Sequence, residues 1–197
     1  MNQERRDRLR DAALAVLAEA GGRGLTHRAV DAAAQVPAGT AKNYFPSRDA
    51  LLRGVAERCL EQYRAVAAAL AGAGPGPSDR AGLAALIAAL LRDVAGPGRA
   101  RVLAYLELQT EATRRPWLAA QLDPIAAGDF AAHRSLLAGA GLPAGPEQVR
   151  ALTLALHGAV PHLLAGAPET LAAAGLDDLD GFARGLLARV CPDEGTA

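Results

Sequence analysis

Lysine, cysteine and aromatic residues are scarce in this chain of 197 residues, and each scarcity narrows what the protein can be. Twenty of the 21 basic residues are arginine, and Lys42 is the only lysine. Aromatic residues make up 4% of the chain and β-branched residues are few, whereas alanine and leucine abound. Alanine and leucine favour helices, and strands are enriched in the scarce residue types. The composition therefore predicts an all-α fold.

The two cysteines exclude a disulfide framework. Cys59 and Cys191 are too few and too far apart for a stapled fold or a metal set, which fits a reducing compartment. Cys59 is expected to pack in the core, with a redox-sensing thiol as the alternative. His157 and His162 are five positions apart, about 140° around a helix, so they do not share a face. We therefore expect no metal site and no cofactor.

Long apolar runs are also missing. No uninterrupted run of about 20 apolar residues is present, as a membrane-spanning helix requires. Residues 1–6 lead into an amphipathic helix without the apolar segment of a signal peptide. We expect a cytoplasmic protein that has no membrane partner.

The motifs of common enzyme classes are absent as well. The sequence has no glycine-rich phosphate loop that opens a helix, no nucleophile elbow and no metal motif. Residues 71–78 are rich in glycine and proline, but they form a loop between helical segments and not a phosphate cradle. These absences argue against an enzyme.

The charge is unevenly distributed along the chain. The formal net charge is zero, which argues against a generally basic nucleic-acid coat protein. Residues 1–64 nevertheless carry 11 basic and 8 acidic side chains, whereas the remainder carries 10 and 13. A modestly positive end suits a small DNA-reading domain beside a larger domain with another role.

Hydrophobic periodicity and helix breakers together predict about nine helices. The first is expected to end at Gly21-Gly22, and a kink is expected at Pro161. Two short helices are predicted between Thr26 and Phe45. The other predicted helices cover about residues 3–20, 48–70, 79–94, 99–114, 124–139, 146–165 and 176–190.

The two short helices form a recognisable motif. Thr26 can cap the first of them, and Pro37 ends it because proline has no N–H and biases the preceding residue away from the α conformation. A second short helix starts near Ala38 and ends at Phe45-Pro46, after which Ser47 caps a longer helix. Two short helices joined by a tight turn predict a helix-turn-helix, one of the few shapes that fit the DNA major groove.

This pattern resembles the TetR family of transcriptional regulators over about residues 5–55, and by helical layout beyond them. The motif residues are, in order, Gly24-Leu25-Thr26, Val36-Pro37, Gly39-Thr40, Asn43-Tyr44-Phe45, Ser47-Arg48-Asp49 and Leu51-Leu52. The resemblance implies an N-terminal three-helix DNA-binding domain over residues 1–46. It also implies a C-terminal helical ligand-binding and dimerisation domain over residues 47–197.

Several side chains are candidates for contact with a double-stranded DNA operator. Thr40 and Asn43 offer hydrogen-bonding groups, and Tyr44 can contact a phosphate or a thymine methyl group. The resemblance places His27, Arg28 and Arg48 where family members clamp phosphates. The full predicted set is His27, Arg28, Ala38, Gly39, Thr40, Lys42, Asn43, Tyr44 and Arg48.

Two sets of cations allow alternatives. Lys42 stands where the family often has an aromatic residue, so it is either a chance occurrence or a flexible cation placed on DNA. The first helix carries Arg5, Arg6, Arg8 and Arg10. These arginines either form a solvated face whose charge nearby acidic residues balance, or they contact DNA phosphates. Phe45 is expected in the core.

The resemblance also implies a homodimer that holds two palindromic half-sites. In the family, the last two long helices pair with their copies as a four-helix bundle. The predicted helix 146–165 is apolar over most of its circumference, so it needs burial on more than one side, although a central core helix is the alternative. The predicted interface residues are Leu152, Leu156, Ala159, Leu163, Phe182 and Leu186.

A small-molecule cavity within residues 80–170 is a further implication of the resemblance. Ordinary core packing is the alternative for each apolar candidate. The predicted ligand-binding residues are Leu86, Leu90, Tyr105, Leu106, Gln109, Trp117, Phe130, His133 and His157.

The hypothesis that results is a ligand-responsive, homodimeric repressor that a small, mainly apolar molecule releases from its operator. One alternative is an activator of the same fold, because the sign of regulation depends on where the operator lies. Another is a helical protein-interaction module without DNA contact, against which the cations Arg28, Lys42 and Arg48 argue.

Overall fold

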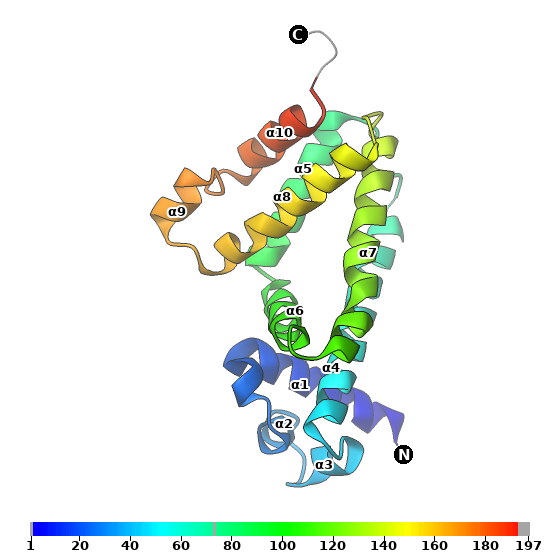
Figure 1. The fold of residues 1–197 in the computed structure, drawn as a ribbon, viewed down its shortest axis with the longest axis vertical. Coiled ribbons are helices and arrows are strands. Elements are labelled where there is room, and N and C mark those ends of the chain that lie inside the picture. Colours follow the sequence, from blue (N-terminus) through cyan, green and yellow to red (C-terminus); the bar gives the residue numbers. More distant parts are fainter. Residues whose placement is uncertain (1, 73, 193–197) are drawn as a thin grey trace. The chain divides into compact units, whose positions relative to one another are not determined.

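A computed structural model describes residues 2–72 and 74–192 of the chain (Figure 1). Over these residues the fold is all-α, as predicted, with ten helices and no strand. The helices are α1 (Gln3–Gly24), α2 (His27–Ala33), α3 (Thr40–Tyr44), α4 (Arg48–Gly72), α5 (Arg80–Ala95), α6 (Arg99–Ala112), α7 (Pro116–Gly139), α8 (Pro146–Ala165), α9 (Pro168–Ala173) and α10 (Leu179–Val190).

Two helices differ from the prediction. The helix expected from Pro124 begins at Pro116, and Pro124 lies inside it. Leu118 and Leu122, which precede that proline, are buried, so packing outweighs the lost backbone hydrogen bond. The short α9 was not predicted; Pro168 stands at its start, where a missing N–H costs nothing.

Glycine ends the regular part of α1 where expected. Gly21 leaves the helical conformation with φ 65° and ψ −176°, and a last turn follows to Gly24. Few residues other than glycine adopt this φ, so the sequence fixes the break.

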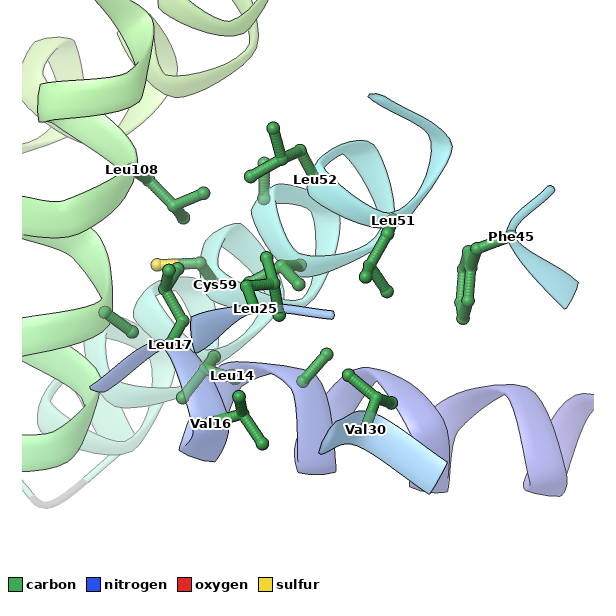
Figure 2. Packing of buried hydrophobic residues seen from close by; sticks show 14 of the residues in the cluster. Leu14, Val16, Leu17, Leu25, Val30, Phe45, Leu51, Leu52, Cys59 and Leu108 are labelled. Carbon is green, nitrogen blue, oxygen red and sulfur yellow. The ribbon is translucent and has the colours of Figure 1, made fainter. Parts of the chain in front are cut away.

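The chain divides into two compact units. Unit 1 comprises residues 1–69 and 100–125. It therefore contains α1, α2, α3, most of α4, α6 and the start of α7, whereas α5 lies outside it. Figure 2 shows Leu108 of α6 among Leu17, Leu52 and Cys59 in its core. The predicted domains 1–46 and 47–197 divide the chain by role, and that division stays a prediction.

Cys59 is a core residue of unit 1. Its side chain is fully buried, and burial raises the pKa of its thiol to about 12. A thiol that stays protonated is a poor nucleophile. Of the two expectations for Cys59, packing is therefore the one that the structure favours.

Unit 2 comprises residues 70–99 and 126–197. Its core is formed by α5, α8 and α10 together with the later turns of α7, with Leu83, Leu137, Leu152 and Leu187 fully buried. Asp79 caps α5 by accepting a hydrogen bond from the Gly82 N–H at 2.7 Å. No single helix among the described residues is long and apolar enough to cross a bilayer, although α5 and α6 meet that test when taken together.

Gly54 of α4 makes room for Phe45, and this contact yields a test of the unit 1 core. A Cβ atom on Gly54 would lie 2.6 Å from the Phe45 Cε1 atom. We expect Gly54→Ala to lower the free energy of unfolding by about 1–3 kcal/mol, because the ring must shift in a close-packed core. Urea denaturation measures this. The control is Gly128→Ala in α7, where a Cβ meets nothing within 4 Å and the better helix propensity should stabilise the protein slightly.

Candidate DNA-binding surface and ligand cavity

The start of α3 is held by a carboxylate of α2. The Asp31 side chain accepts hydrogen bonds from the Gly39 N–H at 2.7 Å and from the Ala41 N–H at 2.6 Å. Asp31 is only 4% exposed, and these two donors satisfy both of its oxygens. Gly39 has φ 89°, so glycine is needed here for the backbone path.

The end of α3 is held by the same helix. The His27 Nε2–H donates to the Phe45 carbonyl oxygen at 2.6 Å, at the residue that ends α3. Phe45 is 1% exposed and packs in the core of unit 1, as expected. α2 therefore fixes both ends of a helix of five residues, which is too short to be stable alone.

With its ends fixed, α3 presents one polar face to solvent. Lys42 and Asn43 are exposed, and among the described residues neither side chain has a hydrogen-bonding or ionic partner. Ala41, between them and the core, is fully buried. Thr40 and Tyr44 are half-buried, and the Thr40 hydroxyl donates to the Pro37 carbonyl oxygen at 2.6 Å. Ala38, Gly39 and Arg28 are exposed.

Arg48 lies differently from the expectation of a phosphate contact. Its guanidinium donates to the carbonyl oxygens of Leu25 at 2.8 Å and Gly22 at 2.6 Å, and it pairs with Glu111 at 3.1 Å. Three acceptors of the chain thus hold this side chain. The structure assigns Arg48 to joining the end of α1, α4 and α6.

The arginines of α1 divide into two groups. Arg6 pairs with Glu57, and the nearly buried Arg10 donates to Glu61 at 2.8 Å and contacts Asp7. These two arginines serve the α1–α4 contact. Arg5 and Arg8 are exposed, and no side-chain partner of either is found among the described residues.

Asp31, Glu107 and Glu111 are the positioning residues that sequence reasoning missed. Glu107 accepts from the Gly22 N–H at 2.9 Å, and Glu111 pairs with Arg48. The available signal for Asp31 was an acid directly after the buried Val30, eight residues before Gly39. Nothing local marks the positioning role of the two glutamates, because Gly22 and Arg48 lie more than 60 positions away from them.

Unit 2 contains a cavity of about 140 Å³ between α5, α7 and α8. Its wall is mainly aliphatic, and its polar side chains are Asp129, His133 and His157. The aliphatic lining is Leu83, Ile87, Leu90, Leu91, Val94, Leu136, Leu152, Leu156 and Val160.

Three predicted ligand residues line this cavity, namely Leu90, His133 and His157, and the others lie elsewhere. Phe130 and Leu86 are half-buried residues of unit 2 outside the lining. The remaining four, Tyr105, Leu106, Gln109 and Trp117, belong to unit 1. Tyr105 packs against Tyr63 with ring centroids 5.2 Å apart, and the Arg53 guanidinium stacks 3.9 Å from the Trp117 ring centroid.

The polar side chains of the cavity form two pairs. His133 Nδ1 lies 2.8 Å from the hydroxyl of the buried Thr153. The His157 Nε2–H donates to Asp129 Oδ2 at 3.0 Å. Burial lowers the pKa of His133, and the nearby Asp129 carboxylate offsets part of this effect. His133 is therefore neutral near neutral pH.

Three of the six predicted dimer residues are buried within the single chain. Leu152, Ala159 and Leu186 pack in the core of unit 2. Leu156, Leu163 and Phe182 are half-buried. Among the exposed residues of α8, the one large aliphatic side chain is Leu154, which is 57% exposed. Small or apolar residues lie beside it, namely Ala151, Gly158, Pro161 and Ala165, and polar residues are exposed as well, namely Glu147, Arg150, His157 and His162.

A helix-turn-helix joined to a helical unit that contains a cavity defines a class, the helical DNA-binding regulators. Two family models match within that class. Residues 9–55 match the model described as bacterial regulatory proteins, tetR family, and residues 78–190 match the tetracyclin repressor-like C-terminal domain. The chain belongs to the TetR family of transcriptional regulators.

Solved structures agree with this assignment. The multidrug binding protein EbrR complexed with imidazole is 32% identical, with 99% of this chain and 94% of that chain covered and a TM-score of 0.66. EbrR complexed with proflavin is 31% identical, with 94% and 99% covered and a TM-score of 0.61. A TetR-family member from Streptomyces coelicolor A3, SCO1917, is 32% identical, with 96% and 99% covered and a TM-score of 0.65. A search of curated proteins finds no match.

Lys42 provides the simplest test of the α3 surface. We expect Lys42→Ala to weaken binding to operator DNA, since a cation on a phosphate releases a counter-ion. The slope of log affinity against log salt concentration should fall by about one for each subunit bound. Fluorescence anisotropy at several salt concentrations measures both quantities. Lys42→Arg, which keeps the charge, should retain the slope, and an unchanged affinity for Lys42→Ala would remove this residue from the interface.

Proposed function

We propose that the chain is a homodimeric repressor that binds a palindromic operator in the cytoplasm and leaves it when a small, mainly apolar molecule binds in unit 2. The observation that carries this proposal is the arrangement of α3. Its two ends are hydrogen-bonded to α2, while Lys42 and Asn43 are exposed and lack partners among the described residues. A polar helix face that is fixed but unpaired suits base and phosphate contacts.

Each predicted DNA-binding residue apart from Arg48 then has a part in DNA binding. Asn43 and Thr40 would contact base edges, Lys42 would contact a phosphate, and Tyr44 would contact a phosphate or a thymine methyl group. Arg28 would clamp the backbone beside them. Ala38 and Gly39, which have little or no side chain, would let the start of α3 approach closely. His27 would act through the Phe45 carbonyl that it holds.

The proposal includes a dimer because one helix-turn-helix makes too few contacts to select a DNA sequence tightly. Two half-sites, each bound by one subunit, would supply the further contacts. The exposed residues of α8 around Leu154 form the surface that would meet a second copy. Small residues such as Ala151 and Gly158 would let two such helices approach closely. The half-buried Phe182 and Leu156 would lie near the rim of this contact.

The ligand role rests on the cavity and on a relative. The cavity is largely aliphatic with few polar groups, as ligand sites commonly are. The similar protein EbrR is a multidrug binding protein whose structures contain imidazole or proflavin. A ligand would release DNA only if it binds the DNA-incompetent state more tightly than the competent one.

The test is fluorescence anisotropy with labelled DNA from upstream of the gene that encodes this chain, at two salt concentrations. Random DNA serves as the competitor. Tight binding that survives the competitor is the expected result. Binding that the competitor abolishes, for this DNA and for other segments of the genome, would contradict the proposal.

A further inference from the structure

Asp129 is the one aspartate or glutamate among the described residues that line the cavity of unit 2. Neither arginine nor lysine is among the described residues that line it. His133 is neutral near neutral pH because it is buried, and it is bonded to Thr153. The Asp129 carboxylate therefore determines the electrostatic character of an otherwise aliphatic space.

Asp129 is only partly compensated within the protein. Its Oδ2 atom accepts one hydrogen bond from His157, whereas no partner of Oδ1 is found among the described residues. The side chains of Asp129 and His157 are 34% and 41% exposed, so water still solvates them in the empty cavity. A ligand that fills the cavity would remove part of this water.

The charge of a ligand decides whether the loss of this water from Asp129 is compensated. A neutral apolar molecule that covers Asp129 would leave a desolvated carboxylate with one donor, which is costly. An anion would add like-charge repulsion in surroundings of low dielectric constant. A cation would replace the lost hydration with an ion pair, and His157 could keep its bond to Oδ2.

We infer that the cavity takes an organic cation, an apolar body with one positive charge, and that the Asp129 carboxylate is its counter-ion. The aliphatic side chains of α5 and α8 that line the cavity, such as Leu90 and Leu156, would pack against the apolar body. This inference rests on the proposed ligand-binding role of unit 2 and narrows it to one chemical class.

Three fluorescent probes of similar size and different charge provide the test. They are the cation proflavin, the neutral N-phenyl-1-naphthylamine and the anion 8-anilinonaphthalene-1-sulfonate. Each is titrated into the full chain without DNA. The wild-type protein should bind proflavin most tightly and the anion most weakly.

The decisive variant is Asp129→Asn, which keeps the shape and removes the charge. We expect its affinity for proflavin to fall about tenfold, in line with a partly exposed charge pair. Its affinity for the neutral probe should stay within about twofold, which also shows that the cavity is intact, and its affinity for the anion should rise. Asp123→Asn, an exposed carboxylate of α7 outside the lining, is the matched control and should bind proflavin like the wild type.

Several results would overturn the inference. They are no binding of proflavin by the wild type, equal proflavin affinity for wild type and Asp129→Asn, or an equal loss in Asp123→Asn. The anisotropy assay on the same preparations tests operator binding separately. If the cavity selects the cationic probe but the protein does not bind operator DNA, the proposed repressor function is wrong and the cation site is supported. If the protein binds operator DNA but the cavity does not select the cationic probe, the cation site is wrong and the repressor function is supported.

Discussion

Replacing Asp31 with alanine is expected to lower operator affinity about hundredfold while the protein stays folded. The carboxylate accepts from the Gly39 and Ala41 N–H groups, so its loss frees the start of α3. A helix cap contributes about 1–2 kcal/mol. A dimer must order two such helices on DNA, so the loss amounts to about 3 kcal/mol, which corresponds to roughly a hundredfold change in the dissociation constant. Fluorescence anisotropy with operator DNA measures it.

A matched control separates positioning of α3 from loss of a cap in general. Asp79→Ala removes the same kind of cap from α5 in unit 2, where the carboxylate accepts from Gly82. Both variants lose one negative charge per subunit, and Asp31→Ala should lose the larger unfolding free energy, because Asp31 is buried and accepts two hydrogen bonds whereas Asp79 is exposed and accepts one. Only Asp31→Ala should lose operator affinity.

Asp31→Asn adds a graded comparison. An amide oxygen can replace one acceptor, but the amide nitrogen would then face a backbone N–H, donor against donor. We expect an affinity between those of the wild type and Asp31→Ala. If Asp31→Ala binds operator as tightly as Asp79→Ala does, α3 does not depend on α2 for its position.

Sequence patterns were enough for the helix-turn-helix, because its signals are local. Thr26 caps α2 by accepting from the Ala29 N–H at 3.1 Å, and the polypeptide turns through Pro37 before α3, as predicted. Asp31 was missed because its two partners are backbone groups eight and ten residues away. No periodicity of apolar residues records such a bond.

The placement of Trp117 shows a second limit. Trp117 was among the predicted ligand-binding residues, but Arg53 stacks on its ring within unit 1. Which unit a helix joins depends on contacts between distant segments. Here residues 100–125 pack with the first 69 residues, and sequence spacing carries no sign of this.

The interface prediction stays untested, and the residues chosen for it show a third limit. Because α8 is apolar around most of its circumference, periodicity cannot tell the face that covers its own core from the face left for a partner. Leu152 and Ala159 face the core, and Leu154 is exposed. Only the packing of α5 and α10 against α8 decides between the two faces.

Leu154→Glu is accordingly expected to raise the dimer dissociation constant at least about hundredfold. Burying a leucine side chain contributes about 1.5–3 kcal/mol, and the contribution here is smaller because Leu154 is 57% exposed in the single chain. Both subunits lose it, and a glutamate in an apolar contact adds a desolvation cost. Sedimentation velocity over a range of concentrations measures the dissociation constant.

Operator binding should fall with the loss of the dimer, since a monomer reaches one half-site only. Thermal unfolding distinguishes this from misfolding, because Leu154 is not among the buried residues of unit 2. Leu70→Glu is the matched control, for Leu70 is the other large apolar side chain that is exposed among the described residues, at 43%. If Leu154→Glu stays as dimeric as Leu70→Glu, the exposed face of α8 is not the subunit interface, and the palindromic mode of DNA binding must be built on another surface.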